Sequence, residues 1–260
     1  LKEHLEIIGF KKAFDYVLEL AKNKESALTE RDILDIHYLV LQDNKQSRGI
    51  YRSVPVRVGS YIAPQPYLIR PLMENLLRDN EEWSKDNILE AVSKFHLEFE
   101  TIHPFIDGNG RTGRLILNLE LIKNGFLPIN IKYKDIETYF NCFNHYRKDD
   151  SKDCSKMIEL VANYELEELD RYISIIKEKD DFISLDTFLK FTHLENKRKE
   201  IEQASNEKFN LNFDFDSEEV MEIRNFGNNK IDGKPYVRQN EISFDKKEFL
   251  EKEEFTKLFF

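Results

Sequence analysis

Residues 115–122 form a stretch that is apolar on nearly every side of a helix. Its apolar members are Leu115, Ile116, Leu117, Leu119, Leu121 and Ile122. A helix of this kind has no face for water, so we expect it at the centre of a helical bundle. Asn124 and Gly125 follow it, and both residue types favour the end of a helix.

Other segments carry an apolar stripe on one face only, with the spacing of an amphipathic helix. They cover about residues 5–21, 33–40, 66–77, 86–102, 135–146 and 155–177. Thr29 and Asp32 have the spacing of a capping box before the second of these helices, and Pro104 ends the fourth. Residues 1–180 are therefore predicted to form one mainly helical domain.

Residues 49–66, which we call the flap, interrupt the helical period. Val54, Val56 and Val58 alternate with other residues before Gly59, as in a short strand that ends in a turn. Pro55 is compatible only with an edge strand. We therefore predict a short β-hairpin between two helices.

The character of the chain changes beyond residue 180. A charged helix is predicted over about residues 185–208, followed by strand-like runs at 209–215 and 236–244. Residues 181–260 are thus expected to form a small α+β appendage, whose role the sequence does not reveal.

The charge balance excludes several classes of partner. Acidic residues outnumber basic ones by 49 to 39, a net charge of −10, which argues against binding to nucleic acids or membrane surfaces. No run approaches the ~18 uncharged apolar residues of a membrane span, and no signal peptide is recognisable. The two cysteines form no disulfide framework, which is typical of the reducing cytoplasm. Because the chain begins at Leu1, we expect sequence upstream of it.

The chemistry is concentrated in residues 103–114, which read HPFIDGNGRTGR. Gly108, Gly110 and Gly113 lie between two predicted helices and lead into the N-terminus of the central one. Free backbone N–H groups and the positive end of the helix dipole converge at such a point, so an anion such as a phosphate chain is the expected ligand.

Charged residues within the same segment suit a polyphosphate. Arg111 and Arg114 share one helix face and can flank successive phosphates. Asp107 can hold Mg²⁺ against them. His103 can accept a proton near neutral pH, so the combination indicates transfer of a phosphorus-linked group to an acceptor.

Each feature also has a plain structural explanation. The glycines can serve only a turn, the arginines can be solvated, and Asp107 can simply cap the helix. His103 can be a packed residue, as we expect for His96, and Phe105 and Ile106 are expected to anchor the loop in the core. All of these features within twelve residues favour function.

These twelve residues match the signature H-x-F-x-[DE]-G-N-G-R-x-x-R, and in this respect the chain resembles Fic-domain proteins. It is similar to the AMP-transferring members rather than the Doc-type kinases, which carry a lysine among the glycines. The segments GIYR, VGSYIAPQP, NGFLPI and ETYF extend the resemblance over about residues 1–180. It implies a Fic-type helical bundle as the fold and protein adenylyltransferase as the activity.

The resemblance also implies roles for the residues of the motif. His103 would deprotonate a Ser, Thr or Tyr hydroxyl of a target protein, which attacks the α-phosphorus of ATP and releases pyrophosphate. Asp107 would bind Mg²⁺. The remaining motif residues would bind the phosphates, with an anion cradle followed by the arginines: Gly108, Asn109, Gly110, Arg111, Thr112, Gly113 and Arg114.

Outside the motif, two further groups are implied in substrate binding. Flap residues Val58, Gly59, Ser60 and Tyr61 would line the nucleotide site and dock the target protein by strand addition. Tyr139 and Phe140 would line the adenine pocket, with helix-core packing as the alternative. The following FNHYR, residues 143–147, departs from the Asn or Ala-Asn that is frequent in the family.

Many family members inhibit themselves through a helix with the motif [ST]-x-x-x-E-[GN]. Ser26, Ser155 and Ser174 each precede a glutamate at this spacing, but Gly or Asn follows in no case. We expect such a helix upstream of Leu1, with a separate antitoxin chain as the alternative.

Three other functions stay open at this point. The same site could remove AMP, it could transfer UMP or another nucleotide, or the chain could be a nucleotide-binding scaffold without turnover. Self-modification and a homodimer are further expectations, whereas the target protein is not readable from the residues.

Overall fold

The computed structural model describes residues 2–42, 44–84, 87–148, 152–178, 182–184, 193–194, 196–201, 236–238 and 241–245. The chain divides into two compact units, Leu1–Glu168 and Leu169–Phe260.

The first unit is helical, as predicted. Its helices are α1 (Lys2–Ala21), α2 (Glu30–Val40), α3 (Ile69–Trp83), α4 (Ile88–Ile102), α5 (Asn109–Lys123) and α6 (Ile136–Tyr146), and α7 (Ser155–Glu178) runs across the boundary between the units. Short 3₁₀ turns precede α3 at Pro66–Leu68 and α6 at Tyr133–Asp135. Helix α3 extends six residues beyond the predicted end at residue 77, because Asn80 is buried and Trp83 packs against the core.

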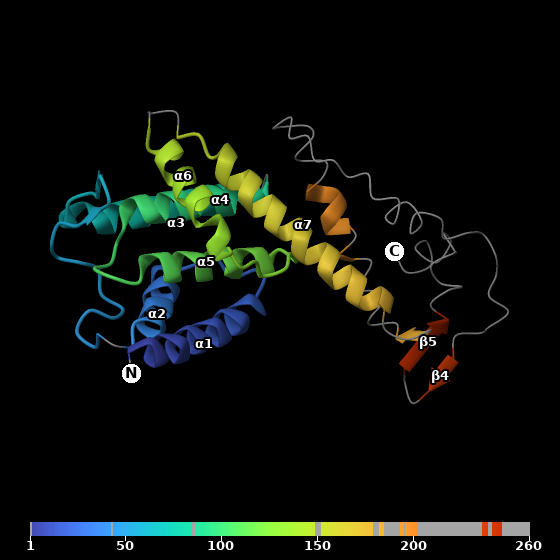
Figure 1. Cartoon of the computed structure of the whole chain (residues 1–260). Coiled ribbons are helices and arrows are strands. Elements are labelled where there is room, and N and C mark those ends of the chain that lie inside the picture. Colours follow the sequence, from blue (N-terminus) through green and yellow to red (C-terminus); the bar gives the residue numbers. More distant parts are fainter. Residues whose placement is uncertain are drawn as a thin grey trace. The chain divides into compact units, whose positions relative to one another are not determined.

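Helix α5 occupies the centre of the bundle, which confirms the prediction from its apolar surface. It packs against α4, α1 and α2, and it lies between α4 on one side and α1 and α2 on the other (Figure 1). Leu115 and Ile116 are completely buried. The core around them includes Ala13 and Val17 of α1, Ile33 and Ile36 of α2, and Phe95, Phe99 and Ile102 of α4.

The predicted helix ends are largely confirmed. The Thr29 hydroxyl accepts a hydrogen bond from the Asp32 N–H, and the Asp32 carboxylate accepts one from the Thr29 N–H, which completes the capping box. Gly125 follows α5 with φ +80°, a conformation that a glycine adopts without strain.

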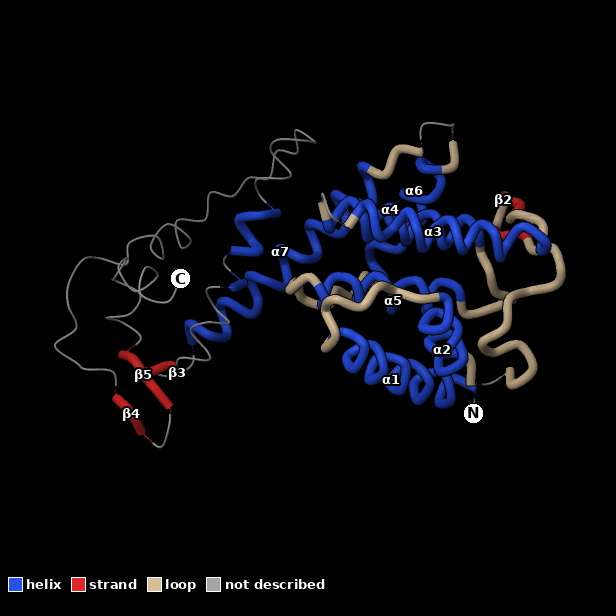
Figure 2. Tube along the Cα trace, turned by 180° about the vertical axis from the view of Figure 1, so that it is seen from behind, coloured by secondary structure: helices blue, strands red, loops and turns tan. Residues whose placement is uncertain are grey.

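The flap contains the expected hairpin, in shorter form. Strands β1 (Arg57–Val58) and β2 (Tyr61–Ile62) pair antiparallel, with Arg57 opposite Ile62 and Val58 opposite Tyr61. The hairpin lies at one end of the helical bundle (Figure 2).

The described part of the second unit contains a three-stranded antiparallel sheet. Strands β3 (Phe182–Ser184), β5 (Glu241–Asp245) and β4 (Tyr236–Arg238) are neighbours in that order. The run predicted at 236–244 thus forms two strands. Of the predicted helix over 185–208, residues 193–194 and 196–201 are described and helical, and the run at 209–215 lies outside the described residues. Within the described residues, no helix has the length and apolar character needed to cross a membrane.

Candidate active site

His103 caps the C-terminus of α4 in an unusual backbone conformation. Its φ of 50° and ψ of 60° are left-handed, while its N–H still donates to the Phe99 carbonyl at 2.9 Å. A residue with a side chain adopts this conformation at a cost of about 1–2 kcal/mol, so surrounding contacts must hold it. It turns the chain out of α4 directly into the motif loop, residues 104–108.

The first of these contacts comes from Arg52, which the sequence analysis did not single out. Arg52 is 5% exposed, and the hydrogen bonds of its guanidinium within the described residues all go to carbonyl oxygens. Nε donates to His103 at 2.8 Å, and Nη2 donates to Ile102 at 3.3 Å. The same side chain donates to Val54 at 2.9 Å and to Pro64 at 2.7 Å. Arg52 therefore ties both ends of the flap hairpin to the C-terminus of α4, where a positive charge is favourable.

Asn109 closes the motif loop from its other end. Its side-chain oxygen accepts from the Phe105 N–H at 2.9 Å, and its amide nitrogen donates to the Phe105 carbonyl at 2.8 Å. Phe105 is completely buried, as expected. Ile106, however, is 43% exposed, so its expected anchoring role is wrong: the tight loop directs only one of the two neighbouring side chains into the core.

His37 also contacts the motif loop and helps to fix its backbone. Its ring stacks on Phe105 with centroids 3.6 Å apart. Nε2 donates to the Asp107 carbonyl at 2.9 Å, and Nδ1 accepts from the Gly49 N–H at 2.9 Å, an arrangement that requires the neutral ring. Burial lowers the pKa of His37 to about 4. The sequence held no signal for this contact, because His37 lies 70 residues from Asp107.

The structure explains why two positions of the motif, Gly108 and Gly113, are occupied by glycine. Gly108 has φ +80° at the start of α5, where a side chain would be strained. Gly113 lies where α5 crosses α4: a Cβ atom there would stand 2.8 Å from Glu100 Oε1 and 3.0 Å from the His96 ring. Gly113 thus allows the two helices to approach closely behind the motif.

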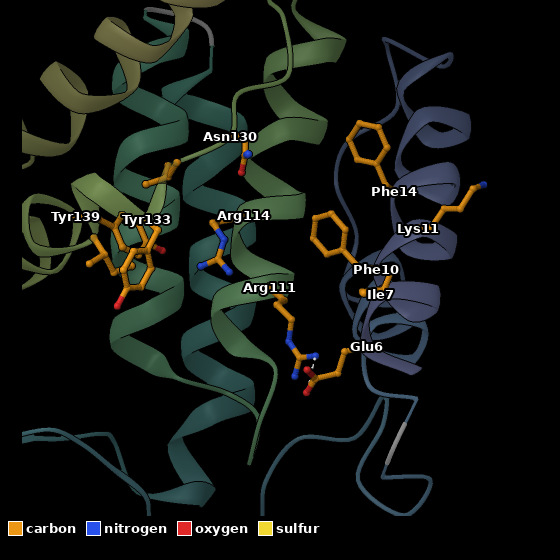
Figure 3. Close-up of a pocket in the computed structure, with 12 residues that line it drawn as sticks. Glu6, Ile7, Phe10, Lys11, Phe14, Arg111, Arg114, Asn130, Tyr133 and Tyr139 are labelled. Atoms are coloured by element: carbon orange, nitrogen blue, oxygen red, sulfur yellow. Dashed lines mark ion pairs between the residues drawn. The ribbon is translucent and has the colours of Figure 1, made fainter. Parts of the chain in front are cut away.

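A cavity of about 860 Å³ opens beside the motif (Figure 3). Side chains of α1, α5, α6 and the segment leading into α6 line it: Glu6, Ile7, Phe10, Lys11, Phe14, Arg111, Arg114, Asn130, Ile131, Tyr133, Ile136 and Tyr139. Arg111 and Arg114 both reach toward it from α5 (Figure 3). The cavity therefore combines aromatic and aliphatic walls with a cationic side, which suits a ligand that is apolar at one end and anionic at the other.

Arg111 already has two acidic neighbours. Its guanidinium lies 3.4 Å from Glu6 Oε1 and 3.6 Å from Asp107 Oδ1. Asp107 itself is half exposed and accepts from the Gly108 N–H at 2.6 Å. Asp107 is an accessible carboxylate next to Arg111, which fits Mg²⁺, because this hard cation takes one or two protein oxygens and completes its shell from phosphates and water.

The other predicted site residues separate into two groups. Asn109, Thr112 and Gly113 are buried within the helix packing and do not line the cavity. Tyr139 lines it and is hydrogen-bonded through its hydroxyl to His96 Nε2 at 2.8 Å, which also gives His96 the structural role we expected. Phe140 is 55% exposed and is not part of the cavity lining.

The flap residues Val58, Gly59, Ser60 and Tyr61 do not line this cavity. Tyr61 instead contacts the end of α4 and donates to the Thr101 carbonyl at 3.1 Å. The Arg147 guanidinium stacks on the Tyr61 ring at 4.2 Å and donates to the Thr101 hydroxyl at 3.0 Å. Arg147, in the segment that departs from the family pattern, therefore holds the flap to α4.

The chain is similar to known proteins of one family. Residues 27–121 match the family model described as the Fic/DOC family. A curated relative named protein adenylyltransferase Fic, from Nematostella vectensis, is 32% identical over 179 residues, which are 66% of this chain and 40% of the relative. Protein adenylyltransferase fic-1 of Caenorhabditis elegans is 29% identical over 191 residues, 70% of this chain and 36% of the relative. The chain thus spans well under half the length of these relatives.

Solved structures show the same fold. A segment of Fic-1 from Caenorhabditis elegans superposes with a TM-score of 0.58 at 27% identity, over 68% of this chain and 53% of that one. A Fic-domain protein from Bacteroides thetaiotaomicron superposes with a TM-score of 0.55 over 78% of this chain and 74% of that one; at 21% identity it supports the fold alone.

Proposed function

Because this chain carries a Fic/DOC family domain, matched over residues 27–121, we propose that it is a protein adenylyltransferase, which transfers AMP from ATP to a Ser, Thr or Tyr hydroxyl of a target protein. We place the catalytic domain within residues 1–180, slightly beyond the first compact unit, and assign no activity to residues 181–260. The relatives named adenylyltransferase support this activity.

One observation carries the proposal. The motif loop holds a histidine at one end and a helix N-terminus with two arginines at the other, and Arg52, His37 and Asn109 fix the backbone between them. A base and an anion site are thus kept a few residues apart on one rigid loop. Such positioning lowers the entropic cost of bringing a hydroxyl and a phosphate together.

In the proposed reaction, His103 accepts the proton of the target hydroxyl. The hydroxyl oxygen forms a bond to the α-phosphorus of ATP while the bond between that phosphorus and the bridging oxygen to the β-phosphate breaks, and pyrophosphate leaves. The backbone N–H groups around Gly108 and Gly110 and the guanidinium groups of Arg111 and Arg114 stabilise the phosphates. Asp107 would hold Mg²⁺, which neutralises charge on the phosphates when it is bound.

The cavity supports a place for the nucleotide next to the two arginines. Tyr139 forms part of its wall, and the exposed ring of Phe140, with its centroid 5.7 Å from that of Tyr139, would extend the aromatic surface toward the base. Residues 58–61 of the flap form a hairpin with an exposed edge, which suits an extended segment of the target protein. Two free cysteines are compatible with the expected cytoplasmic location.

The test uses ATP labelled separately at the α- and γ-phosphates, with magnesium and with a cell extract as a source of targets. Adenylyl transfer predicts protein-bound α-label without γ-label, and a kinase predicts the reverse. His103→Ala should lose the α-label, whereas His145→Ala, a histidine that pairs with Asp153 away from the motif, should keep it. Intact mass spectrometry of the chain itself measures self-modification, and parallel reactions with labelled UTP measure the choice of base. Equal labelling by wild type and His103→Ala would contradict the proposal.

A further inference from the structure

Glu100 is a buried carboxylate with an unusual position. It is 8% exposed and lies in the last turn of α4, where a negative charge opposes the helix dipole. Within the described part of the chain, its Oε1 atom has no hydrogen-bond partner. Burying a carboxylate without full pairing is costly, so a role beyond packing would account for it.

The carboxylate faces the imidazole of His103. Glu100 Oε2 lies 3.6 Å from His103 Nδ1, and this ring nitrogen likewise has no hydrogen-bond partner among the described residues. The distance exceeds that of a hydrogen bond. Hydrogen bonds of catalytic groups are often long in the absence of substrate and shorten in the reacting complex.

Several contacts keep the carboxylate in this place. Its Oε1 atom lies against Gly113, where a Cβ atom would come within 2.8 Å. Arg147 Nη2 donates to the Glu100 carbonyl at 2.8 Å and so fixes the backbone of the same residue. Among the described residues, charged and titratable groups that interact with Glu100 include His96, one turn earlier on α4, His103, Tyr139 and Arg147. Of these, His96 already forms a hydrogen bond between its Nε2 and the Tyr139 hydroxyl.

On the basis of the proposed function, we propose that Glu100 is the positioning residue for His103: it accepts the Nδ1 proton and leaves Nε2 free to act as the base. A neutral imidazole carries one proton. With Nδ1 unprotonated, its lone pair would face the carboxylate oxygen, and the two would repel. The Nδ1–H tautomer removes that repulsion, and the ring is then oriented with its basic nitrogen away from the protein core.

The buried charge has a second effect during transfer. When Nε2 takes the proton of the target hydroxyl, the ring becomes an imidazolium, and the adjacent carboxylate stabilises it without itself taking up a proton. An uncharged group of the same shape would not stabilise the imidazolium in this way. Glu100→Gln is therefore the informative substitution, because it keeps the volume, loses the charge and offers an amide that can donate as well as accept.

The tautomer can be measured without turnover. Long-range ¹⁵N–¹H spectra of the ¹⁵N-histidine-labelled chain distinguish a protonated from an unprotonated ring nitrogen, and His103→Ala identifies the resonances. We expect Nδ1–H for His103 in the wild type and in Glu100→Asp, which keeps the charge, and a shift toward Nε2–H in Glu100→Gln. Glu120→Gln, which removes a buried carboxylate paired with Lys123 in α5, is the matched control and should leave His103 unchanged.

Kinetic measurements distinguish an effect of Glu100 on the position of His103 from an effect on ATP binding. With the substrate found in the labelling experiment, Glu100→Gln should lower kcat by at least about tenfold, part of the ~10²–10⁴ that a general base supplies, and change the Kd for ATP less than twofold. Two results would overturn the proposal. One is an Nε2–H tautomer of His103 in the wild type. The other is a Glu100→Gln variant in which the His103 tautomer is unchanged and kcat equals that of Glu120→Gln. If the wild type transfers no AMP, the proposed function fails, but the tautomer measurement still shows whether Glu100 accepts the Nδ1 proton of His103.

Discussion

The guanidinium of Arg52 donates to the carbonyl oxygen of His103 across 2.8 Å, although 51 residues separate them in the chain. The contact joins the flap to the residue on which the proposed reaction depends. The hydrogen bond forms at a residue with a left-handed backbone, and it offsets part of the cost of that conformation.

Arg52→Lys should destabilise the first unit and abolish transfer. A lysine carries one nitrogen and cannot reproduce the planar set of contacts to four carbonyl groups. The expected loss is about 1–3 kcal/mol of the free energy of unfolding, typical of leaving buried carbonyl groups without a hydrogen-bond donor, and urea denaturation measures it. Arg57→Lys is the control, because that exposed side chain bonds to the nearby Gly59 carbonyl within the same hairpin. Equal stability of the two variants would mean that the flap is held by other contacts.

Arg114→Ala should weaken nucleotide binding and leave the fold intact. The side chain lines the cavity, so its removal deletes a charge-assisted contact to a phosphate. We expect the Kd for ATP to rise about 10–100-fold, corresponding to ~1.5–3 kcal/mol, in isothermal titration with magnesium. Arg31→Ala, an exposed arginine paired with Asp35 on α2, should not alter the Kd. A normal Kd for Arg114→Ala would place the phosphates elsewhere.

Acid should destabilise the first unit through His37. Burial lowers its pKa to about 4, below the ordinary value of 6.5, so the unfolded chain binds more protons between these two pH values. Stability is therefore complete above about pH 6.5 and falls as the pH drops toward 4, by ~2–3 kcal/mol for this residue. Burial lowers the pKa of His96 in the same way, to about 4, which adds to the loss.

The check is the free energy of unfolding from pH 4 to pH 7 for the wild type and His37→Gln. The variant should show a weaker dependence, because glutamine does not titrate and its amide can still donate to the Asp107 carbonyl. His145→Gln is the control outside the loop. An identical slope in the wild type and His37→Gln would refute this assignment.

Raising the pH from about 4.5 to 8 should destabilise the first unit through Glu165. This carboxyl is completely buried, and burial raises its pKa to about 8, while the Leu127 N–H at 3.3 Å opposes the shift. The folded chain then binds more protons than the unfolded one between about pH 4.5 and 8, so stability declines as the pH rises through this range. Glu165→Gln should remove the decline and raise the free energy of unfolding at pH 8.5 by ~1–3 kcal/mol. Glu137→Gln, at an exposed position on α6, should behave as the wild type.

Much of the helical unit could be predicted because the relevant physics is local. The spacing of apolar residues marks the helices, the Thr29–Asp32 pair marks a start, and the all-round apolar surface of residues 115–122 leaves the centre of a bundle as the only stable place. The twelve residues of the motif are likewise contiguous, so the base, the acid and the arginines could be recognised together.

The supporting residues could not be predicted in this way. His37 and Arg52 reach the motif from 70 and 51 residues away, and Arg147 reaches α4 from 46 residues away. No period or cap in the sequence distinguishes such residues from ordinary surface histidines and arginines, because their partners are backbone carbonyls and hydroxyls that only the packing of distant segments brings near.

Neighbouring residues of similar character also differ in burial, which the sequence did not predict. Phe105 and Ile106, and Tyr139 and Phe140, have similar apolar or aromatic character in the sequence, yet one member of each pair is buried and the other is exposed. The sequence by itself determined which helices form and where the reactive groups lie along the chain. Only the tertiary structure decided which side chains face the cavity, which face the core and which hold His103 in place, because burial and partner choice depend on how helices distant in sequence pack against one another.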